Sequence, residues 1–486
     1  MFDLRPMMRV IGYMLITLGG AMLIPALFDF ASGDPDWRGF LLSSALTLFA
    51  GLALYLAGGG APAQNAALNL RQTFLLTVVS WIMVAAFASL PFYFAKAHLS
   101  ATNAFFESVS GFSTTGSTVI VGLDSAGRGT LLWRGLLQWA GGIGIIVTAI
   151  AVMPMLQVGG MQLFHTESSD RSEIKLLPRI GQMARTIGLI YLGISFACAV
   201  SYWLGGMTAF EAVVNMMGTV STGGFATSDK SFMKWDSPVI ESAAILFMFV
   251  GALPVMLFWP VLRGEPMALL GDSQVRAFTA IAVVAVGMLT LFQWVNGINP
   301  GWQAFRYAAF NTVSAISGTG FMNTDYGLWG PFATVFFIVF ILLGGCSGSA
   351  SCGLKIFRVQ ILYLAVLKQV KRLIYPNGVF IAHYNNRPLS DTTISSVTGY
   401  MFLFFLTFII SGSILTATGL DMTTAFSAVA ATLANVGPGM GAIVGPAGNY
   451  SALDPLQIWI LSINMLLGRL ELLTIYVLFL PRFWRR

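Results

Sequence analysis

The chain has 486 residues, of which 56% are hydrophobic and 9% are charged, and its formal net charge is +6. A soluble domain carries about 25% charged residues, so the composition excludes one and indicates that lipid is the main solvent. The cysteines are Cys198, Cys346 and Cys352, which are too few for a disulfide framework. No His or carboxylate stands beside Cys346 and Cys352 to complete a tetrahedral metal site. We therefore interpret the chain as an all-α polytopic membrane protein.

Two apolar runs open the chain, at about residues 7–30 and 38–58, joined by a short polar turn. Each is long enough to cross a bilayer as a helix. The first has no short apolar core followed by a small-residue cleavage site, so we expect it to remain as a membrane helix. Neither run belongs to the repeated pattern that follows, and we expect a two-helix extension.

The stretch at residues 105–116, which ends in Gly-Phe-Ser-Thr-Thr-Gly, returns three more times between hydrophobic spans. Each copy joins a short apolar run to a segment rich in Ser, Thr, Gly or Asn. Such a segment disfavours helix and offers carbonyl and hydroxyl oxygens without a fixed charge, which suits a dehydrated cation. The terminal glycines, Gly116, Gly224, Gly320 and Gly437, are 108, 96 and 117 residues apart. This spacing indicates a fourfold repeat of one structural unit.

Each copy lies between two predicted spans, which with the N-terminal pair makes ten. The paired spans are 72–95 with 130–157, 182–204 with 238–262, 276–296 with 331–372, and 392–418 with 455–481. The corresponding division of the chain is 1–70 for the extension, then 71–158, 159–263, 264–374 and 375–486 for the four units.

The short helices, exemplified by 101–112 and 424–433, reach under about 20 Å into a hydrocarbon core about 30 Å thick. The chain must then turn back within the membrane. Non-helical backbone is tolerated at that depth only where protein buries it or water reaches it. We therefore expect the four loops to line one central pathway; they are 113–118, 221–226, 317–322 and 434–440.

Charge asymmetry predicts the orientation. Of the 26 Lys and Arg residues, 18 fall at span ends on one side, seven on the other, and Arg469 falls within a span. The positive-inside rule then places both termini in the cytoplasm. Acidic residues outnumber basic ones on the outer side, a distribution that concentrates cations at a pore mouth. Glu107 lies inside a predicted pore helix, where a carboxylate needs a partner or a role.

The last span of the third unit, Pro331–Arg372, has 42 residues and as one helix would be about 63 Å long, twice what a membrane needs. Its run Gly344–Gly353 contains four glycines, which weaken a helix by about 4 kcal/mol relative to alanine. We expect the helix to break there. The run then either forms a loop that obstructs permeation or serves as a small-residue packing face.

Arg469 is a charge in the middle of the last span. Glu471 is two positions away and so lies on another helical face, where it cannot easily neutralise the arginine. Arg469 should face water or backbone carbonyls. It either contributes to a gate or caps carbonyls of the broken third-unit helix, and the two roles are compatible.

Four motifs in this order resemble the TrkH/TrkG branch of the bacterial Trk/Ktr potassium-uptake family. They are the runs 111–116 and 344–349, Asn435-Val-Gly-Pro-Gly439 and Gly468-Arg-Leu-Glu-Leu472. The resemblance covers nearly the whole chain, including the two extra N-terminal spans. It implies four membrane-pore-membrane units around a potassium pathway, a homodimer in the bacterial inner membrane, and control by a cytosolic nucleotide-binding ring of the TrkA type.

The resemblance also implies site residues. The filter residues are Thr114, Thr115, Gly116, Thr222, Gly223, Gly224, Gly318, Thr319, Gly320, Asn435, Val436 and Gly437. The gate residues are Gly344, Gly345, Gly348, Gly353, Lys355 and Arg469. The transported ion is K⁺, with no organic cofactor on this chain, no nucleic-acid partner and no enzymatic activity. Glycine at the last filter position resembles potassium-conducting members. Gly223 and Gly318 depart from the pattern, and we expect them to loosen the filter.

Alternatives remain at this point. A sodium-permeable or poorly selective member of the same family fits the residues, and an ion-coupled solute symporter would also contain broken helices. A membrane enzyme would need clustered catalytic groups, but His98, His165 and His383 are scattered. For a cytosolic partner, we predict docking on the charged segment 158–180 and on Lys368, Lys371 and Arg372.

Overall fold

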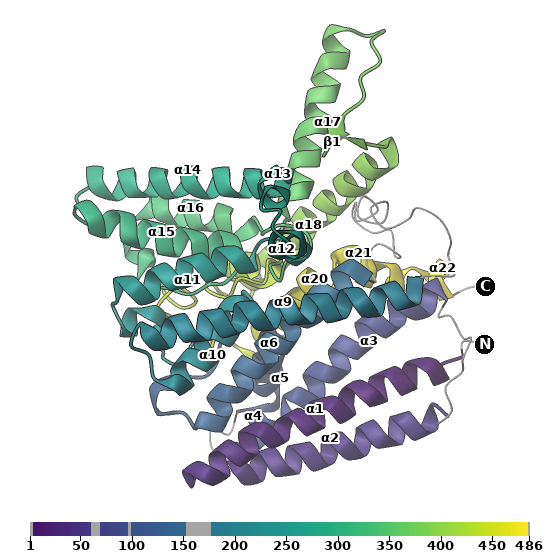
Figure 1. Ribbon diagram of the computed structural model, residues 1–486, viewed down its shortest axis with the longest axis vertical. Coiled ribbons are helices and arrows are strands. Elements are labelled where there is room, and N and C mark those ends of the chain that lie inside the picture. Colours follow the sequence, from purple (N-terminus) through teal and green to yellow (C-terminus); the bar gives the residue numbers. More distant parts are fainter. Residues whose placement is uncertain (1–2, 60–68, 96–98, 152–175, 386, 485–486) are drawn as a thin grey trace.

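The computed structural model describes residues 3–59, 69–95, 99–151, 176–385 and 387–484. This part of the chain is almost entirely helical (Figure 1). The strands it contains are β1 (His383–Tyr384) and β2 (Arg387–Pro388), which form a short antiparallel hairpin. Both ends of the chain lie on the same side of the molecule, as Figure 1 shows. The all-α membrane architecture expected from composition is confirmed.

The N-terminal extension is a helical hairpin along one edge of the bundle (Figure 1). It consists of α1 (Arg5–Ser32) and α2 (Trp37–Ala57). The two helices cross closely because small residues face each other: a Cβ atom added to Gly12 would lie 2.5 Å from the backbone nitrogen of Tyr55. The Ser44 hydroxyl donates to the Gly19 carbonyl across the same contact, at 2.7 Å.

Each of the four units contains a first spanning helix, then a central helix that leads into the predicted filter loop, which we call the short helix, and then a further helix that is bent or broken in three of the units. The first two units are α3 (Leu70–Ala88) with its continuation α4 (Leu90–Phe94), α5 (Ala101–Phe112) and α6 (Arg128–Ala151), then α9 (Leu176–Leu204), α10 (Ala209–Val220) and α11 (Pro238–Gly251). The last two are α14 (Ser273–Val295), α15 (Gly301–Ser317), α16 (Pro331–Leu342) and α17 (Ile356–Ile374), then α18 (Asp391–Ala417), α19 (Met422–Leu433) and α20 (Pro455–Arg469).

Short helical segments connect or end the units. They are η1 (Leu123–Ser125), η3 (Ser231–Lys234), η4 (Val255–Leu257), α12 (Phe258–Leu262), α13 (Met267–Gly271), η5 (Tyr326–Trp329), α21 (Leu472–Tyr476), η6 (Val477–Phe479) and α22 (Pro481–Trp484).

Two spans that we predicted as continuous, 238–262 and 455–481, are bent. The first bends by 99° between Gly251 and Val255, and the second by 108° between Arg469 and Leu472. Pro254 has no N–H to continue the first helix, and Glu471 adopts a left-handed φ of 62° that ends the second. Within the described residues seven helices are long and apolar enough to span, or up to nine if each bent pair counts as one span. The third-unit break is confirmed, since the helix ends at Leu342 and resumes at Ile356.

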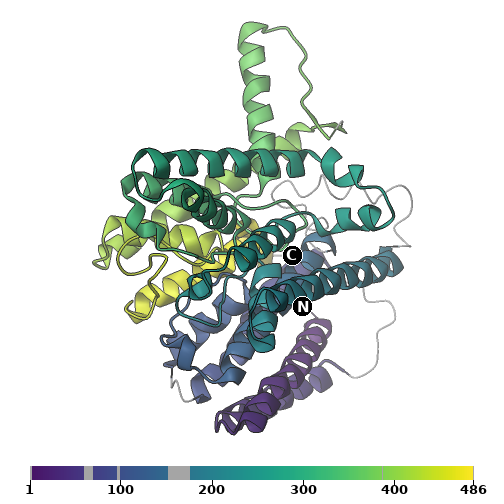
Figure 2. The same cartoon turned by 60° about the vertical axis from the view of Figure 1, so that its left-hand side comes forward.

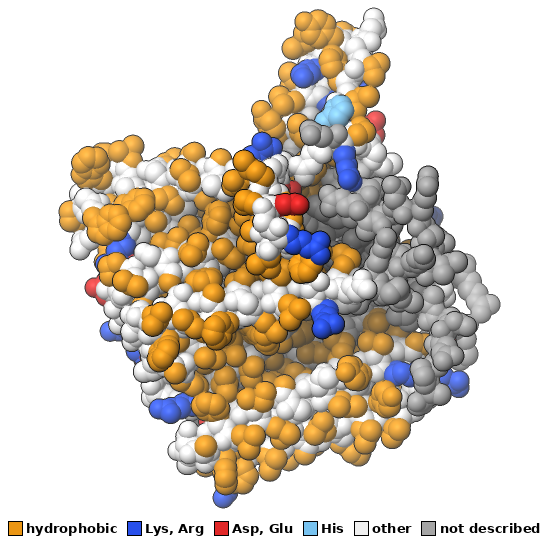
Figure 3. Space-filling model, in the orientation of Figure 1, with side chains coloured by type: hydrophobic (Ala, Val, Ile, Leu, Met, Phe, Trp, Pro, Cys, Tyr) orange, Lys and Arg blue, Asp and Glu red, His pale blue; other side chains and the backbone are white. Residues whose placement is uncertain are grey.

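The C-terminal parts of the four short helices are buried, at residues 106–111, 214–220, 308–317 and 427–433. In α19, every residue from Ser427 to Leu433 is buried, whereas only 33% of the best apolar window of α18 is buried. Figure 3 shows hydrophobic side chains spread over the described helices on this face, with few charged ones among them. The outer surface therefore suits lipid, and the short helices are enclosed by protein.

Candidate ion pathway

The four predicted filter segments each follow the C-terminal end of a central short helix. The helices α5, α10, α15 and α19 end within two residues of Thr114, Thr222, Gly318 and Asn435, respectively. A helix C-terminus carries about half a negative charge from its unpaired carbonyls. Four such ends directed at one place make it favourable for a cation.

The four segments form a closed ring. In each, the final glycine lies against the middle carbonyl of the next segment, so closely that an added Cβ atom would overlap that oxygen. The Cβ-to-oxygen distances would be 2.3 Å from Gly116 to Gly223, 2.0 Å from Gly224 to Thr319, 1.9 Å from Gly320 to Val436, and 2.7 Å from Gly437 to Thr115. The chain thus brings together all twelve predicted filter residues around one axis, in the order of the units.

The backbone of the ring repeats as well. In each segment the first and third residues adopt a positive φ. The first residues are Thr114 (52°), Thr222 (51°), Gly318 (78°) and Asn435 (54°), and the third are Gly116 (88°), Gly224 (78°), Gly320 (80°) and Gly437 (105°). A left-handed conformation costs a non-glycine residue about 1–2 kcal/mol. In the third unit the first filter residue is Gly318, which adopts this left-handed conformation without the cost that Thr114, Thr222 and Asn435 carry.

Two hydrogen bonds, repeated in every unit, fix each loop to its short helix. The middle filter residue donates its N–H to the carbonyl five positions earlier: Thr115 to Ser110 at 2.9 Å, Gly223 to Gly218 at 2.7 Å, Thr319 to Ser314 at 2.9 Å and Val436 to Ala431 at 2.8 Å.

The second repeated bond joins a polar side chain of the short helix to the N–H three residues beyond the final glycine. The pairs are Glu107 with Val119 at 2.9 Å, Asn215 with Thr227 at 3.2 Å, Asn311 with Asn323 at 3.5 Å and Ser427 with Met440 at 2.8 Å. Sequence reasoning missed Asn215, Asn311 and Ser427. The available signal was a polar residue nine or ten positions before each final glycine.

Glu107 has the partner that we expected it to need. The Arg134 side chain, from α6, donates from Nε to the Glu107 carboxylate at 2.8 Å, and both side chains are buried. The guanidinium also donates to the Ala226 carbonyl at 3.1 Å and lies 3.9 Å from the centre of the Phe225 ring. This buried pair joins the loops of the first and second units.

A cavity of about 260 Å³ lies against one end of the ring. Its lining includes all four final glycines, together with Asp229 and Tyr450. The Tyr450 hydroxyl donates to the Gly437 carbonyl at 2.8 Å. We call this cavity, which lies against the four final glycines, the vestibule.

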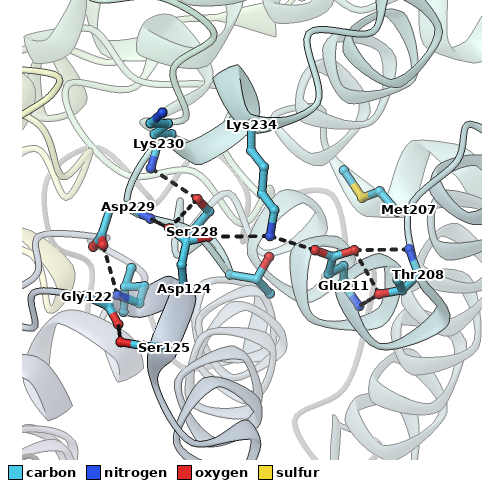
Figure 4. A network of polar contacts seen from close by, with 12 residues as sticks. Gly122, Asp124, Ser125, Met207, Thr208, Glu211, Ser228, Asp229, Lys230 and Lys234 are labelled. Carbon is cyan, nitrogen blue, oxygen red and sulfur yellow. Dashed lines mark hydrogen bonds and ion pairs between the residues drawn. The ribbon is translucent and has the colours of Figure 1, made fainter.

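Beside this vestibule, charged side chains join the first two units (Figure 4). Lys234 lies between Glu211, at 2.9 Å, and Asp124, at 3.4 Å. Burial raises the pKa of the Asp124 carboxyl, but hydrogen bonds from Ser228 and the Asp229 backbone and the charge of Lys234 outweigh it, so the net pKa is lowered. The hydrogen bond to Glu211 is the main reason that the pKa of Lys234 is raised.

The break in the third unit, residues 343–355, folds back on itself. The Gly344 N–H donates to the Leu354 carbonyl at 3.1 Å. A Cβ atom on Gly344 would lie 1.7 Å from the Cys352 carbonyl oxygen, so only glycine fits. Gly348 and Gly353 adopt left-handed φ values of 77° and 75°. The glycines are thus used for a compact loop.

This loop is bound to the bend of the second unit. Cys346 N–H donates to the Ala252 carbonyl at 2.9 Å, and Val255 N–H donates to the Gly348 carbonyl at 3.1 Å. Gly345 also faces the bend, since its Cβ would lie 2.8 Å from the Ala252 oxygen. On the filter side, a Cβ on Gly318 would lie 3.2 Å from the Ser351 hydroxyl oxygen. The loop therefore lies directly against the third filter segment.

Arg469 is the last residue of α20 and is 2% exposed. Its Nη1 donates to the Ala350 carbonyl at 3.2 Å and lies 2.8 Å from Cys352 Sγ, and its Nη2 donates to the Gly141 carbonyl at 3.1 Å. The arginine thus caps a carbonyl of the loop, as one of our two interpretations required. Its position against the loop is equally compatible with the other.

Glu471 has a different partner. Its carboxylate accepts from Arg358 Nη2 at 2.5 Å, and the Arg358 guanidinium lies 3.8 Å from the Tyr400 ring centre. Lys355, which directly precedes α17, is 5% exposed. Arg358 and Glu471 therefore join the start of α17 to the bend after α20. We predicted Arg469 and Glu471 on different faces of one helix, but α20 ends at Arg469 and Glu471 lies in the bend.

A family profile, curated relatives and a solved structure all match this chain over most or all of its length. The sequence profile of the TrkH family, described as cation transport protein, matches residues 46–486. The chain is 43% identical over 482 residues to the Trk system potassium uptake protein TrkI of Halomonas elongata, covering 99% of this chain and 97% of the relative. It is 36% identical over 485 residues to TrkH of Escherichia coli K12, covering 99% of both. The crystal structure of the potassium transporter TrkH from Vibrio parahaemolyticus superposes with a TM-score of 0.91 at 33% identity, covering 100% of both chains.

Proposed function

Because this chain belongs to the TrkH family of cation transport proteins, we propose that it is the potassium-translocating membrane subunit of a Trk-type uptake system. The observation that carries the proposal is the closed ring of four loops, in which each final glycine lies against the next unit's middle carbonyl. A ring of backbone oxygens replaces the water that an ion loses.

In this proposal the filter comprises Thr114 to Gly116, Thr222 to Gly224, Gly318 to Gly320 and Asn435 to Gly437. Ions collect in the vestibule, where Asp229 contributes a carboxylate. The C-terminal ends of the four short helices then favour a cation over an anion in the ring. Hydrogen bonds from each short helix hold the loops at a fixed separation, which supports selection by size and field strength.

The gate in this proposal is the loop beneath the filter, with Gly344, Gly345, Gly348, Gly353, Lys355 and Arg469. The glycines permit the compact fold that fills the passage, and Arg469 holds it through Ala350. The positive charges of Lys355 and Arg469 oppose a cation at this constriction. At about 4 Å and an effective dielectric constant of 20, one such charge opposes a cation by about 4 kcal/mol.

The homodimer, the cytosolic regulatory ring and the inner-membrane location are further parts of this proposal. The helix α17 projects from the body (Figure 2) and exposes a row of large apolar side chains there, which supports a contact with a second copy. These are Tyr363, Val366, Val370, Leu373 and Ile374. The excess of Lys and Arg on the side of both termini supports a cytosolic location for them and a cytosolic partner.

Reversal potentials in mixed potassium and sodium test the proposed function. The protein is reconstituted in liposomes, with empty liposomes as the control and no organic solute present. We expect current whose reversal potential follows the potassium gradient. A reversal potential that follows sodium equally would favour the poorly selective alternative, and a current that is absent until an organic solute is added would favour a symporter.

A further inference from the structure

The second filter segment lacks side chains that the other segments have. It carries glycine at the middle filter position and again five residues earlier, at Gly223 and Gly218. The equivalent pairs in the other units are Thr115 with Ser110, Thr319 with Ser314, and Val436 with Ala431. In the first and third units the serine hydroxyl binds its own loop, from Ser110 to the Ser117 carbonyl at 2.5 Å and from Ser314 to the Phe321 carbonyl at 2.6 Å. The second unit has no hydroxyl to do this.

The Gln138 side chain of the first unit fills the space that Gly223 leaves, and it lies beside Gly218. A Cβ atom added to Gly223 would meet three atoms of the Gln138 amide, at 2.5, 2.7 and 2.8 Å, and one added to Gly218 would lie 3.2 Å from its Oε1. The Gln138 side chain comes from α6 and is fully buried. A side chain from a neighbouring unit thus takes the place of the missing one.

The Gln138 amide binds both sides of the filter backbone. Its Nε2 donates to the Gly223 carbonyl, and its Oε1 accepts from the Phe225 N–H at 3.0 Å. An amide offers a donor and an acceptor on two separate atoms without charge. The Gly223 oxygen is also the atom against which Gly116 lies. A displacement of this carbonyl would therefore alter the contact between the first two units.

We infer that Gln138 is a positioning residue that fixes the Gly223 carbonyl and thereby sets how well the pathway distinguishes K⁺ from Na⁺. This inference rests on the proposed function of the ring as a filter. It reverses the expectation that Gly223 loosens the filter, because a hydrogen bond from outside the loop restrains the backbone that glycine would otherwise free.

The first test compares Gln138→Leu and Gln138→Glu with the wild type. Leucine removes both hydrogen bonds, and glutamate keeps an acceptor for Phe225 while it loses the donor to Gly223. The control is Gln293→Leu, because Gln293 in α14 is also fully buried and its Oε1 accepts from Asn299 rather than from the filter. We expect the K⁺/Na⁺ permeability ratio to fall about fivefold in both Gln138 variants, the equivalent of one hydrogen bond. The ratio should be unchanged in the control.

The second test is a rescue. With Gln138→Ala the space beside residue 223 is empty, and Gly223→Thr then restores the side chain that Thr115 and Thr319 provide in their own units. Residue 223 is not among the positive-φ positions, so its backbone accepts a threonine. We expect each single variant to lower the permeability ratio and the double variant to recover most of it.

The outcomes separate the inference from the proposal beneath it. If Gly116→Ser alters the permeability ratio but the Gln138 variants do not, the filter stands and Gln138 has only a packing role. If none of these variants alters the ratio, the ring is not the selectivity filter and both ideas fail. The positioning role would also be overturned if the Gln138 variants lost as much thermal stability as Gln293→Leu but kept the wild-type K⁺/Na⁺ permeability ratio.

Discussion

Arg469 donates a hydrogen bond to the carbonyl oxygen of Ala350 at 3.2 Å, joining the bend of the fourth unit to the intramembrane loop of the third. The same guanidinium reaches Gly141 of the first unit, so one side chain connects three of the four units beneath the ring. A movement of α17 or α21 would therefore change the position of the loop. This arrangement makes the gate proposal testable by changes at two separate positions.

Arg469→Ala and removal of Ser347–Ser349 from the loop should each raise K⁺ flux in the absence of the cytosolic partner. Both changes act at one constriction, so their effects on the conduction barrier should not add in the double variant. Arg469→Lys separates the causes, because it keeps the charge but loses the planar set of donors. Flux into liposomes measures all four variants. Additive barrier changes, or no increase in either single variant, would leave the loop as a packing surface.

Gly116→Ser should lower the K⁺/Na⁺ permeability ratio while the protein still inserts. The added Cβ would lie 2.3 Å from the Gly223 oxygen, so that carbonyl must move. Gly264→Ser is the matched control, since Gly264 has a similar φ of 92° but no atom within 4 Å of an added Cβ. Both carry a strain of about 1–2 kcal/mol, and only the first should change the reversal potential. Equal ratios in the two variants would exclude residue 116 from the filter.

The buried pair of Glu107 and Arg134 should show strong coupling in a double-mutant cycle. Glu107→Gln and Arg134→Met each leave an uncompensated buried group, and each should cost about 3–5 kcal/mol of stability. The double variant should lose less than the two single losses together. Thermal unfolding in detergent, followed by size-exclusion chromatography, provides the comparison. If the stability loss of the double variant equals the sum of the two single losses, the contact between Glu107 and Arg134 contributes no specific coupling.

The outer contact between Asp124 and Lys234 should weaken at acidic pH. The pKa of Asp124 is lowered from 3.8 in the folded protein, so its contribution is present above that value and is lost as pH falls through the lower folded value. The Asp124 side chain is 50% exposed, so solvent screening limits the effect to less than about 1 kcal/mol. Asp124→Asn should therefore lower the unfolding temperature at pH 7, and the difference from wild type should shrink near pH 3. A difference that stays constant between these pH values would contradict the assignment.

Reversal of charge at Lys371 and Arg372 should weaken co-purification with a cytosolic regulatory ring at low salt. Both residues are exposed near the end of the projecting α17, where rim charges steer association. Lys230→Glu is the control, because it changes an exposed charge that lies beside the vestibule rather than on α17. Full retention of the complex by the Lys371→Glu, Arg372→Glu double variant would move docking elsewhere. The other predicted docking segment, 158–180, lies mostly outside the described residues, as does the unit boundary at 158.

Much of the architecture followed from the sequence because it depends on local chemistry. The short helix over 101–112 begins and ends where predicted, since Ser100 caps it and the Ser/Thr/Gly run after Phe112 cannot continue it. The break between Leu342 and Ile356 followed from glycine content and from the mismatch between helix length and membrane thickness. Four glycines at regular spacing likewise indicated four equivalent loops.

Only the tertiary structure revealed what surrounds each loop. Gln138 is 85 residues from Gly223, and no local pattern connects an amide on one unit's helix to a missing side chain in the next. The bends at Pro254 and Glu471 also depend on long-range contacts, since Val255 binds Gly348 and Glu471 binds Arg358. Sequence period and composition report what each segment prefers by itself, whereas the partner of a buried polar group is decided by which units become neighbours when the ring closes.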